Sequence, residues 1–458
     1  MKKTCRAFFS AVLLLPLVFF LIAFFNSHVA SSGTPPLIRV GISLTANHLV
    51  LSLENGDFIT DQGSGDTKTF MSGTYRLENS SSGIRITDTV ENSYGVFIGP
   101  LQIESERGTF KIGNSRYGST YSGSLEIFPR GNSGLTAVNI VDMESYLRGV
   151  VPREIIASWG NYDGMEAIKA QAVAARTFAH NHLIQGNHKN DPYDLCDTQH
   201  CQVYGGKDCE TANTNRAVAE THGQILTWNG KPIEAFFHSN NGGYTECSAN
   251  VWMTALPYLS SQPDPFDDPE NRNLQNHPNA IWEKDIPIRT LNNLLAGGSA
   301  STVVDEVKIA SVFSSGRVNE LRISGGGYAA SFLKERARTV LGLRSQLYTV
   351  SEQPQSRVWI ASVNKDGREI KESYAELEGK WIANSHGINR MLTGKHFSVM
   401  GAGGGDTVPY LAYIFKGRGW GHGIGMSQYG AYNRSRAGQT YSEILSFYYP
   451  GAELVNKY

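Results

Sequence analysis

A short apolar run closed by Pro152 precedes a long, alanine-rich stretch whose apolar residues recur three and four positions apart. Because the residue before a proline is pushed away from helical geometry, we predict a first helix that runs from Met143 to about Val151. We predict that a second helix starts with a capping box at 163–166 and buries one face. That face carries Met165, Ile168, Ala172, Ala175, Ala179 and Leu183. Glu154 falls at the junction, where its carboxylate points into a cleft or lies solvated in a loop.

Shorter apolar runs predict strands in the rest of the chain. Alternating runs such as Ile38–Ile42, separated by turns rich in glycine, serine and asparagine, predict a β-rich region over 35–134. Strands and helices are mixed over 135–458, and residues 285–405 have the pattern of an inserted α+β lobe. The predicted fold is therefore α+β, with a β-rich N-terminal region followed by a mixed α/β domain.

The N-terminus has the pattern of an export signal. Lys2, Lys3 and Arg6 precede an uncharged apolar run, Phe8–Phe25. The length of this run lies between that of a long signal-peptide core and that of a short membrane span. We expect residues 1–31 to act as a signal peptide or a membrane anchor, and the protein to be exported to the cell envelope, anchored there or secreted.

The length of the chain bounds the number of domains, and its charge bears on whether it binds nucleic acid. The 458 residues allow two or three domains and a large core. The 41 basic and 42 acidic residues nearly cancel, so no bulk positive charge is available to hold nucleic acid. We therefore expect no nucleic-acid partner.

The cysteines allow two structural interpretations. Beyond the leader the chain contains Cys196, Cys201, Cys209 and Cys247. Outside the cytosol these allow two disulfides, for example Cys196–Cys201 and Cys209–Cys247. Alternatively, Cys196, His200 and Cys201 are close enough in sequence to share a tetrahedral Zn²⁺, with His188 or His182 as the fourth ligand. Either role is structural, and no cofactor is required for catalysis.

A glycine-dense segment near the C-terminus, Lys416–Ala431, is a second candidate binding feature. It lacks the Gly-Lys-Ser/Thr of a Walker loop and the distant acidic residue of a dinucleotide fingerprint. Its glycines allow a ligand or another backbone to approach closely. The side chains between them, which suit a sugar, are Trp420, His422, Ser427, Gln428 and Tyr429. The alternative is a tightly packed structural loop with a core histidine.

Ordered motifs give the chain a resemblance to a known family. They are VVPREI followed by EAIKAQAVAARTFA, then CDTQHCQVYGG, AFFHSNNGGYTE and GRGWGHGIGMSQYGA. In this order they resemble the SpoIID/LytB family, which includes the sporulation stage II protein D, a peptidoglycan lytic transglycosylase, and amidase-enhancer proteins. The resemblance covers residues 135–458 and implies that this part is a SpoIID-like catalytic domain; 35–134 is covered weakly or not at all.

The resemblance implies that Glu154 is the catalytic residue. Lytic transglycosylases cleave the MurNAc–GlcNAc bond with the muramyl 6-hydroxyl as internal nucleophile, leaving 1,6-anhydromuramyl ends. One carboxyl group can protonate the leaving oxygen and then deprotonate that hydroxyl, whereas a conventional glycosidase usually needs two carboxylates. A cleft should raise the pKa of Glu154 by desolvation. Asp163 is the candidate for a second acid.

The resemblance also implies substrate-binding residues. Arg176 is expected to face the groove near Glu154, with a structural ion pair as the alternative. Tyr258 matches an aromatic residue near the groove, and Ser260 stands where relatives often carry a basic residue. His422, Ser427 and Gln428 are further candidates from the glycine-dense segment.

The expected substrate is glycan strands of peptidoglycan, in peptide-stripped form. The alternative function is a non-catalytic, peptidoglycan-binding enhancer of an N-acetylmuramoyl-L-alanine amidase; a structural envelope scaffold is a third class. Partners then include a cell-wall amidase or sporulation membrane proteins, with the membrane reached through the N-terminal segment.

Overall fold

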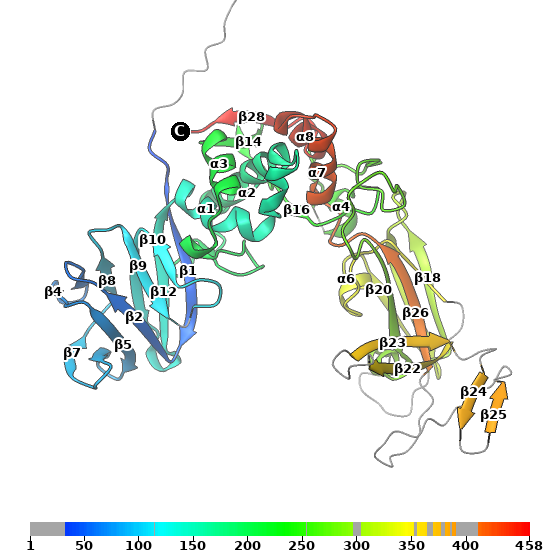
Figure 1. Ribbon diagram of the computed structural model, residues 1–458, viewed down its shortest axis with the longest axis horizontal. Helices are drawn as coiled ribbons and strands as arrows, with labels where there is room; N and C mark the ends of the chain where they lie inside the picture. Colours follow the sequence, from blue (N-terminus) through cyan, green and yellow to red (C-terminus); the bar gives the residue numbers. More distant parts are fainter. Residues whose placement is uncertain are drawn as a thin grey trace, which may run out of the picture.

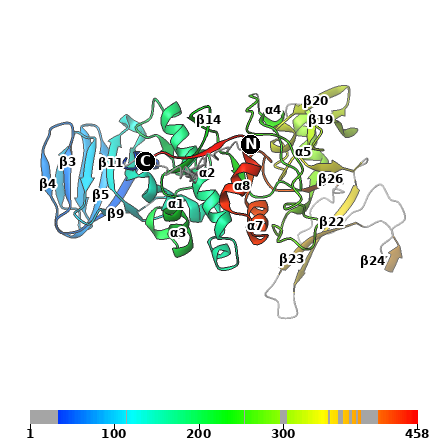
Figure 2. The same cartoon turned by 90° about the horizontal axis from the view of Figure 1, so that it is seen from above.

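The computed structural model describes residues 33–113, 115–252, 254–295, 304–351, 355–363, 370–376, 381–384, 387–390 and 411–458. The expected leader, 1–31, lies outside the described residues. The described chain forms an arch with helices at its top and β-rich parts at its two ends (Figure 1). From above, the helices lie between these two ends (Figure 2). The predicted α+β class is confirmed.

Two sheets of mainly antiparallel strands form the N-terminal end of the arch. In the described chain one has the order β13-β1-β12-β11-β8-β3-β4, and the other β10-β9-β2-β5-β6-β7. Alternation along the strands gives each sheet a buried face: in β2, Leu49, Leu51 and Leu53 are buried and the residues between them are not. The strands are β1 (Leu37–Ala46), β2 (His48–Leu53), β3 (Phe58–Asp61), β4 (Thr67–Thr69), β5 (Gly73–Ser80), β6 (Gly83–Asp88), β7 (Ser93–Phe97), β8 (Leu101–Glu104), β9 (Thr109–Gly113), β10 (Thr120–Ser122), β11 (Ser124–Pro129), β12 (Leu135–Asp142) and β13 (Leu195–Cys196).

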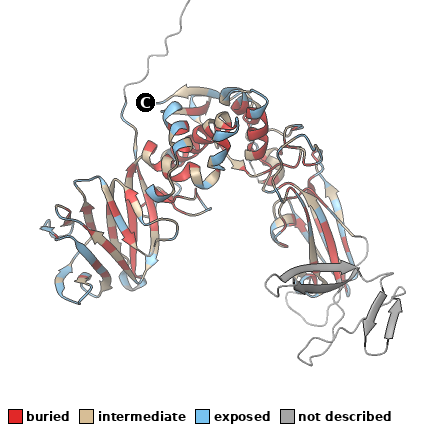
Figure 3. Ribbon diagram, viewed as in Figure 1, coloured by how far each residue is buried: buried red, intermediate tan, exposed pale blue. Residues whose placement is uncertain are grey.

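Strand β12 joins the β-rich region to the first helix. It pairs with β1 on one side and β11 on the other, and helix α1 (Met143–Glu154) begins directly after it. The boundary expected between 134 and 135 therefore falls between neighbouring strands of one sheet. A single cluster of buried apolar residues includes Ile38 of β1 and Leu147 of α1. Buried residues lie both in the strands of this end and in the helices at the top of the arch (Figure 3). The β-rich region and the helix that carries Glu154 share one core.

The helices at the top of the arch pack around α2. This helix is buried almost throughout between Ala167 and His182, and its alanines let neighbouring elements approach closely. It ends at Gly186, whose φ of 64° is the left-handed conformation common at helix C-termini. The helices of this part are the 3-10 helix η2 (Ala157–Asn161), α2 (Met165–Gln185), η3 (Gly206–Cys209), α3 (Ala212–Glu220), α7 (Gln428–Arg436) and α8 (Tyr441–Tyr448). The short helix α4 (Ser248–Val251) contacts the lobe through Lys334.

The first helix ends later than predicted. It continues through Pro152 to Glu154, and the Ile155 amide donates to the Val151 carbonyl at 3.0 Å. A proline in the last turn removes the bond to the Arg148 carbonyl only, so the helix tolerates it. Glu154 is therefore the last helical residue rather than part of a free loop.

The predicted capping box at 163–166 is wrong. Asp163 has a left-handed backbone (φ 59°), and the cap of α2 is Gly164, which has no side chain to accept a hydrogen bond. The Glu166 carboxylate instead accepts from Lys169 at 2.8 Å and from the Tyr441 amide at 2.9 Å. These contacts tie α2 to the start of α8.

The other end of the arch is a lobe with a core of its own, which includes Trp282, Leu321 and Phe415. Its long strand β26 returns the chain to α7 (Figure 1). No helix among the described residues is both long and apolar enough to cross a membrane. The lobe consists of β17 (Ile281–Pro287), α5 (Ile288–Leu295), β18 (Glu306–Val312), β19 (Val318–Gly325), β20 (Tyr328–Leu333), α6 (Arg336–Thr339), β21 (Tyr348–Val350), β22 (Gln355–Val363), β23 (Ile370–Glu376), β24 (Trp381–Asn384), β25 (Gly387–Arg390) and β26 (Leu411–Arg418).

Short strands complete the top of the arch. Strand β14 pairs with β15 and with β28, close to the C-terminus, and β16 runs parallel to β27 at the start of α7. The pairing of β16 and β27 places the glycine-dense segment beside the AFFHSNNGGYTE motif. These strands are β14 (Gln224–Trp228), β15 (Lys231–Pro232), β16 (Phe237–His238), β27 (Met426–Ser427) and β28 (Glu453–Asn456).

Candidate active site

Glu154 lies where three motifs distant in sequence meet. The Val203 amide donates to its Oε1 at 3.1 Å. The side chain of Gln428, the first residue of α7, donates to the Glu154 carbonyl at 2.7 Å and to Gln171 Oε1 of α2 at 3.4 Å. The carboxylate and the backbone of Glu154 are thus held by separate elements, so its position is fixed on both sides.

Burial raises the pKa of the Glu154 carboxyl group above its ordinary value. The Val203 amide and the positive charge of Arg153 act in the opposite direction and only partly offset this desolvation. No second carboxylate among the described residues is a cause of the shift. Asp163, the candidate second acid, is exposed beyond η2. Glu154 is a single, partly desolvated acid that can hold a proton and release it.

Arg176 does not reach the surface beside Glu154. Its guanidinium is fully buried and binds both carboxylate oxygens of Glu144, at 2.7 and 2.8 Å. It also donates to the carbonyls of Val218 and Gln224, each at 3.2 Å. The expectation that Arg176 faces a substrate groove is therefore corrected: its donors are used in a buried ion pair that joins α1, α2, α3 and β14.

Tyr258 and Ser260 make structural contacts away from Glu154. The Tyr258 ring is buried near Trp228, and its hydroxyl accepts from the Glu234 amide at 3.2 Å. The Ser260 carbonyl accepts from the Thr245 hydroxyl at 3.0 Å. Neither residue contacts Glu154 within the described structure.

The glycine-dense segment separates its three candidate residues. Ser427 is buried, caps α7 and donates to Asp267 Oδ2 at 2.5 Å. His422 packs against His238, and desolvation lowers the pKa of its imidazole to about 3, so the ring is neutral. Only Gln428 of the three contacts Glu154 in the described chain. A side chain at Gly423 would meet the Arg317 guanidinium at 2.3 Å, so here the glycine allows close packing within the protein.

A row of ring contacts leads from the vicinity of Glu154 to the surface. Trp159 of η2 lies against Tyr429, the neighbour of Gln428, at 4.9 Å between ring centroids. Tyr429 contacts His277 at 5.3 Å, and His277 contacts Trp420 at 4.9 Å. Trp420 is 38% exposed. No local sequence pattern marks Trp159 or His277, because their proximity to the other rings arises only from the fold.

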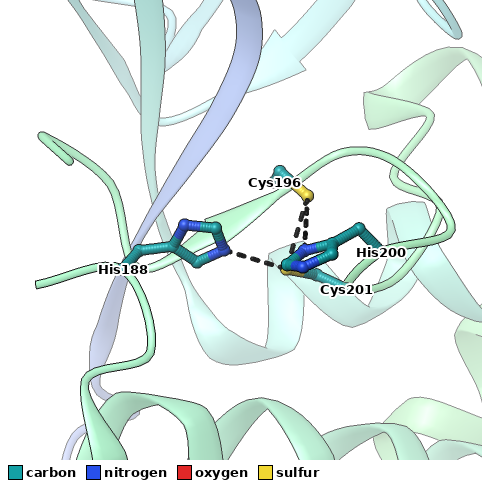
Figure 4. Close-up of side chains that lie close together, drawn as sticks. All are labelled: His188, Cys196, His200 and Cys201. Carbon is teal, nitrogen blue, oxygen red and sulfur yellow. Dashed lines mark hydrogen bonds between the residues drawn. The ribbon is translucent and has the colours of Figure 1, made fainter. Parts of the chain in front are cut away.

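Four side chains from the cysteine-bearing segment form a compact cluster (Figure 4). The ligand atoms of His188, Cys196, His200 and Cys201 all lie within 4.8 Å of one another. The Cys196–Cys201 sulfur distance is 3.3 Å, and His188 Nε2 lies 3.3 Å from the Cys201 sulfur. The His200 Nδ1 atom lies 3.7 and 3.5 Å from the two sulfurs.

The chemistry of the cluster suits a tetrahedral ion. For metal bonds of about 2.3 Å to sulfur and 2.0 Å to nitrogen, ligand atoms of a tetrahedron lie about 3.5 Å apart. A hydrogen bond from Cys201 lowers the pKa of Cys196 and so favours the thiolate form that binds metals. The other ring nitrogen of His188 contacts Asp191 at 3.1 Å, as expected for an oriented metal-ligating histidine. The four cysteines among the described residues are unpaired thiols, and Cys209 donates to the carbonyls of Gly149 and Gly206.

The fold and the site define an α+β protein built around one isolated glutamate at the end of a helix, beside a glycine-dense loop. A family model for the stage II sporulation protein matches residues 131–228. The "Amidase enhancer" of Bacillus subtilis is 33% identical over 332 residues, which are 68% of this chain and 40% of that protein.

Two relatives carry the name "Stage II sporulation protein D". The Bacillus subtilis protein is 27% identical over 381 residues, 78% of this chain and 89% of its own length. The Bacillus amyloliquefaciens protein is 28% identical over 332 residues, 69% of this chain and 75% of its own length. Over these ranges the chain is similar to proteins of the SpoIID family. It spans about 40% of the length of the amidase enhancer and most of the length of the sporulation proteins.

Proposed function

We propose that this protein is a lytic transglycosylase that cleaves MurNAc–GlcNAc bonds in peptide-stripped glycan strands. The observation that carries the proposal is the state of Glu154, a single carboxyl group with a raised pKa and no carboxylate partner among the described residues. A protonated carboxyl group is the form that a general acid requires at the start of the reaction.

One carboxyl group balances the whole reaction. Protonated Glu154 donates its proton to the glycosidic oxygen as the bond from this oxygen to C1 of the muramyl residue breaks. The resulting carboxylate removes the proton of the muramyl 6-hydroxyl, whose oxygen bonds to C1 and closes the 1,6-anhydro ring. Glu154 ends protonated, and no water is consumed. The Val203 amide stabilises the carboxylate form between the two steps.

Digestion of stripped and intact peptidoglycan, with mass spectrometry of the products, tests this function. The wild type should release 1,6-anhydromuramyl ends, and Glu154→Gln should release none above background. Glu220→Gln, which removes an exposed carboxylate on α3, is the matched control and should behave as wild type. Hydrated reducing ends in place of anhydro ends would instead identify a hydrolase.

The second candidate function is enhancement of an amidase. It is favoured by the 33% identity to a protein named amidase enhancer. In that case the chain binds glycan and increases the activity of a cell-wall amidase, and Glu154→Gln leaves the enhancement unchanged. Both functions place the protein in the cell envelope, on peptidoglycan, with an amidase or sporulation membrane proteins as partners.

We also propose that the four-residue cluster holds a structural Zn²⁺. His188, Cys196, His200 and Cys201 would be its ligands, and Asp191 would orient His188. Zinc bound there would act as a cross-link and would take no part in the reaction. Because Val203 follows Cys201 by two residues, the cross-link would fix the loop that contacts Glu154.

A further inference from the structure

A loop of the β-rich region is fastened beside Glu154. This loop, residues 115–119, leads from β9 to β10. The Asp208 carboxylate in η3 accepts from the Ser119 amide at 2.6 Å, the Ser119 hydroxyl at 2.8 Å and the Thr120 amide at 2.9 Å. These hydrogen bonds hold the pKa of Asp208 at about 2 despite some desolvation. These hydrogen bonds therefore attach the loop to η3, the element that follows Val203 in the chain.

The backbone of the loop approaches η3 very closely. A side chain at Gly118 would lie 2.1 Å from the Gly205 carbonyl oxygen, so only glycine fits there. Pinned at Gly118 and Ser119, the loop places Tyr117 beside α1. The fold thus fixes the position of Tyr117 without a bound ligand.

Two arginines from different parts of the chain contact the Tyr117 ring. The Arg153 guanidinium carbon is 5.4 Å from the ring centroid, and that of Arg116 is 5.9 Å from it. Arg153 is the neighbour of Glu154 in α1, and its charge acts on the Glu154 carboxyl group. Both arginines are exposed. The Tyr117 ring thus brings two positive charges to the edge of the candidate active site.

Neither arginine has an acidic partner in contact. Among the described residues no carboxylate lies within ion-pair distance of Arg116 or Arg153. The positive charge of Arg116 partly offsets the rise that burial causes in the pKa of Asp197, but the two side chains form no ion pair. Two exposed guanidinium groups beside one ring repel each other, and an anion bound next to them would relieve this repulsion. Guanidinium groups bind carboxylates through paired hydrogen bonds.

We propose that Arg153, Arg116 and Tyr117 form a carboxylate-binding site for the lactyl group of a peptide-stripped muramyl residue. This inference rests on the proposed function, because it assumes that a glycan strand lies at Glu154. The lactyl group is attached to the muramyl ring itself, and stripping converts its neutral amide into a carboxylate. Stem-peptide carboxylates lie farther from the ring. The site therefore distinguishes stripped from intact strands, and the β-rich region supplies two of its three residues, Arg116 and Tyr117.

Equilibrium binding to the full chain carrying Glu154→Gln tests the site without turnover. Three probes are compared: stripped glycan oligosaccharides, the same oligosaccharides with their carboxyl groups converted to methylamides, and neutral chitooligosaccharides of equal length. Arg153→Gln and Arg116→Gln should each weaken binding of the stripped glycan about tenfold at low salt. Binding of the two neutral probes should change less than about twofold, because neither carries the charge.

Two further variants make the result specific. Arg153→Lys keeps the charge but not the paired hydrogen bonds, so it should recover part of the binding. Arg216→Gln, at an exposed arginine of α3, should bind all probes as the parent does. Equal weakening for charged and neutral probes would show that the arginines act structurally and would overturn the proposal. So would unchanged binding of the stripped glycan.

Intact strands distinguish the two sources of carboxylate. If glycan that carries stem peptides binds more tightly than stripped glycan and loses this advantage in Arg153→Gln, the site reads the peptide and the lactyl assignment is wrong. The binding result does not depend on catalysis. Absence of anhydromuramyl products would overturn the proposed function, while a charge-specific loss of binding in Arg153→Gln would still identify the carboxylate site.

Discussion

The Val203 backbone amide donates to Oε1 of Glu154 at 3.1 Å, although the two residues lie 49 positions apart. Val203 follows Cys201 by two residues, and Cys201 is a member of the four-residue cluster. Strand β13, which contains Cys196, pairs with β1 of the β-rich region. The segment that fixes the carboxylate is thus attached to the N-terminal sheet at one end and to the cysteine–histidine cluster in its middle.

The first prediction concerns metal content. Protein purified without reductant should contain about one zinc per chain, and Cys201→Ser should lose it because a hydroxyl replaces the thiolate ligand. Cys209→Ser is the matched control, since Cys209 donates to backbone carbonyls outside the cluster and its loss should leave zinc in place. Elemental analysis with thiol counting measures both quantities. A Cys196–Cys201 disulfide in metal-free protein would contradict the prediction.

The second prediction is the pH dependence of stability in Glu154→Gln. Because the folded-state pKa of Glu154 is raised, the folded protein binds its proton more tightly than the unfolded chain. The contribution of Glu154 to stability is present below the ordinary glutamate pKa and is lost as pH rises through the raised value. Glutamine does not titrate. The free energy of unfolding of Glu154→Gln relative to wild type should therefore increase from pH 4 to pH 7, as measured by urea denaturation at both values.

The same shift predicts the pH profile of the reaction. The general acid is the protonated form, so cleavage of stripped glycan should decline as pH rises above the raised pKa. Replacing the carboxyl group in Glu154→Gln should lower the rate by about 10²- to 10⁴-fold at pH values where wild-type Glu154 is protonated, and this difference should narrow as the wild type loses its proton. A cleavage rate that rises as pH increases past the raised pKa of Glu154 would show that Glu154 is not the acid of the first step.

The third prediction separates the two roles considered for Arg176. Arg176→Met leaves the Glu144 carboxylate buried without its partner, which should cost about 3 to 5 kcal/mol in the free energy of unfolding. Adding Glu144→Gln in the same chain should recover part of this loss. Urea denaturation of the single and double variants measures it. Normal stability together with weakened glycan binding would instead support a substrate-binding role.

Local patterns predicted the helices better than they predicted the site. The spacing of apolar residues identified α2, and Glu154 was found beside it because the motif is continuous in sequence. The late end of α1 was not predicted, because one missing hydrogen bond in a last turn is tolerated when the helix is packed on both sides. The capping box at 163–166 failed because Asp163 adopts a left-handed backbone, and Glu166 contacts Lys169 of its own helix and the Tyr441 amide of α8.

Contacts between distant segments could not be predicted from any local pattern. Gln428 reaches the Glu154 carbonyl across 274 positions, and Glu144 pairs with Arg176 across 32. The contact of Tyr117 with Arg153 depends on a loop of the β-rich region, for which the sequence offered no chemical role. In contrast, the proximity of Cys196, His200 and Cys201 was predicted, because these three residues lie within six positions, while the fourth member was left open between His188 and His182.

The fourth prediction concerns Trp420, at the exposed end of the row of ring contacts. Arg344 lies over its ring at 4.6 Å, and His277 contacts it at 4.9 Å, so the indole is held in place while 38% of the residue remains exposed. A sugar ring that covers this exposed part of the indole would bury apolar area. Trp420→Ala removes that area, which should cost about 1 to 2 kcal/mol of binding free energy. Calorimetry with chitooligosaccharides measures this cost.

Stacking on Trp420 requires no charge. Trp420→Ala should therefore weaken the binding of stripped glycan and of neutral chitooligosaccharides equally, whereas Arg153→Gln should weaken the binding of stripped glycan alone. Tyr328→Ala provides the control, since Tyr328 is an exposed aromatic residue of the lobe that lies outside the row. Its removal should leave binding of both ligands unchanged. If Trp420→Ala binds both ligands as the parent does, the exposed indole does not contact the strand, and the row of rings serves only to pack α7 against η2.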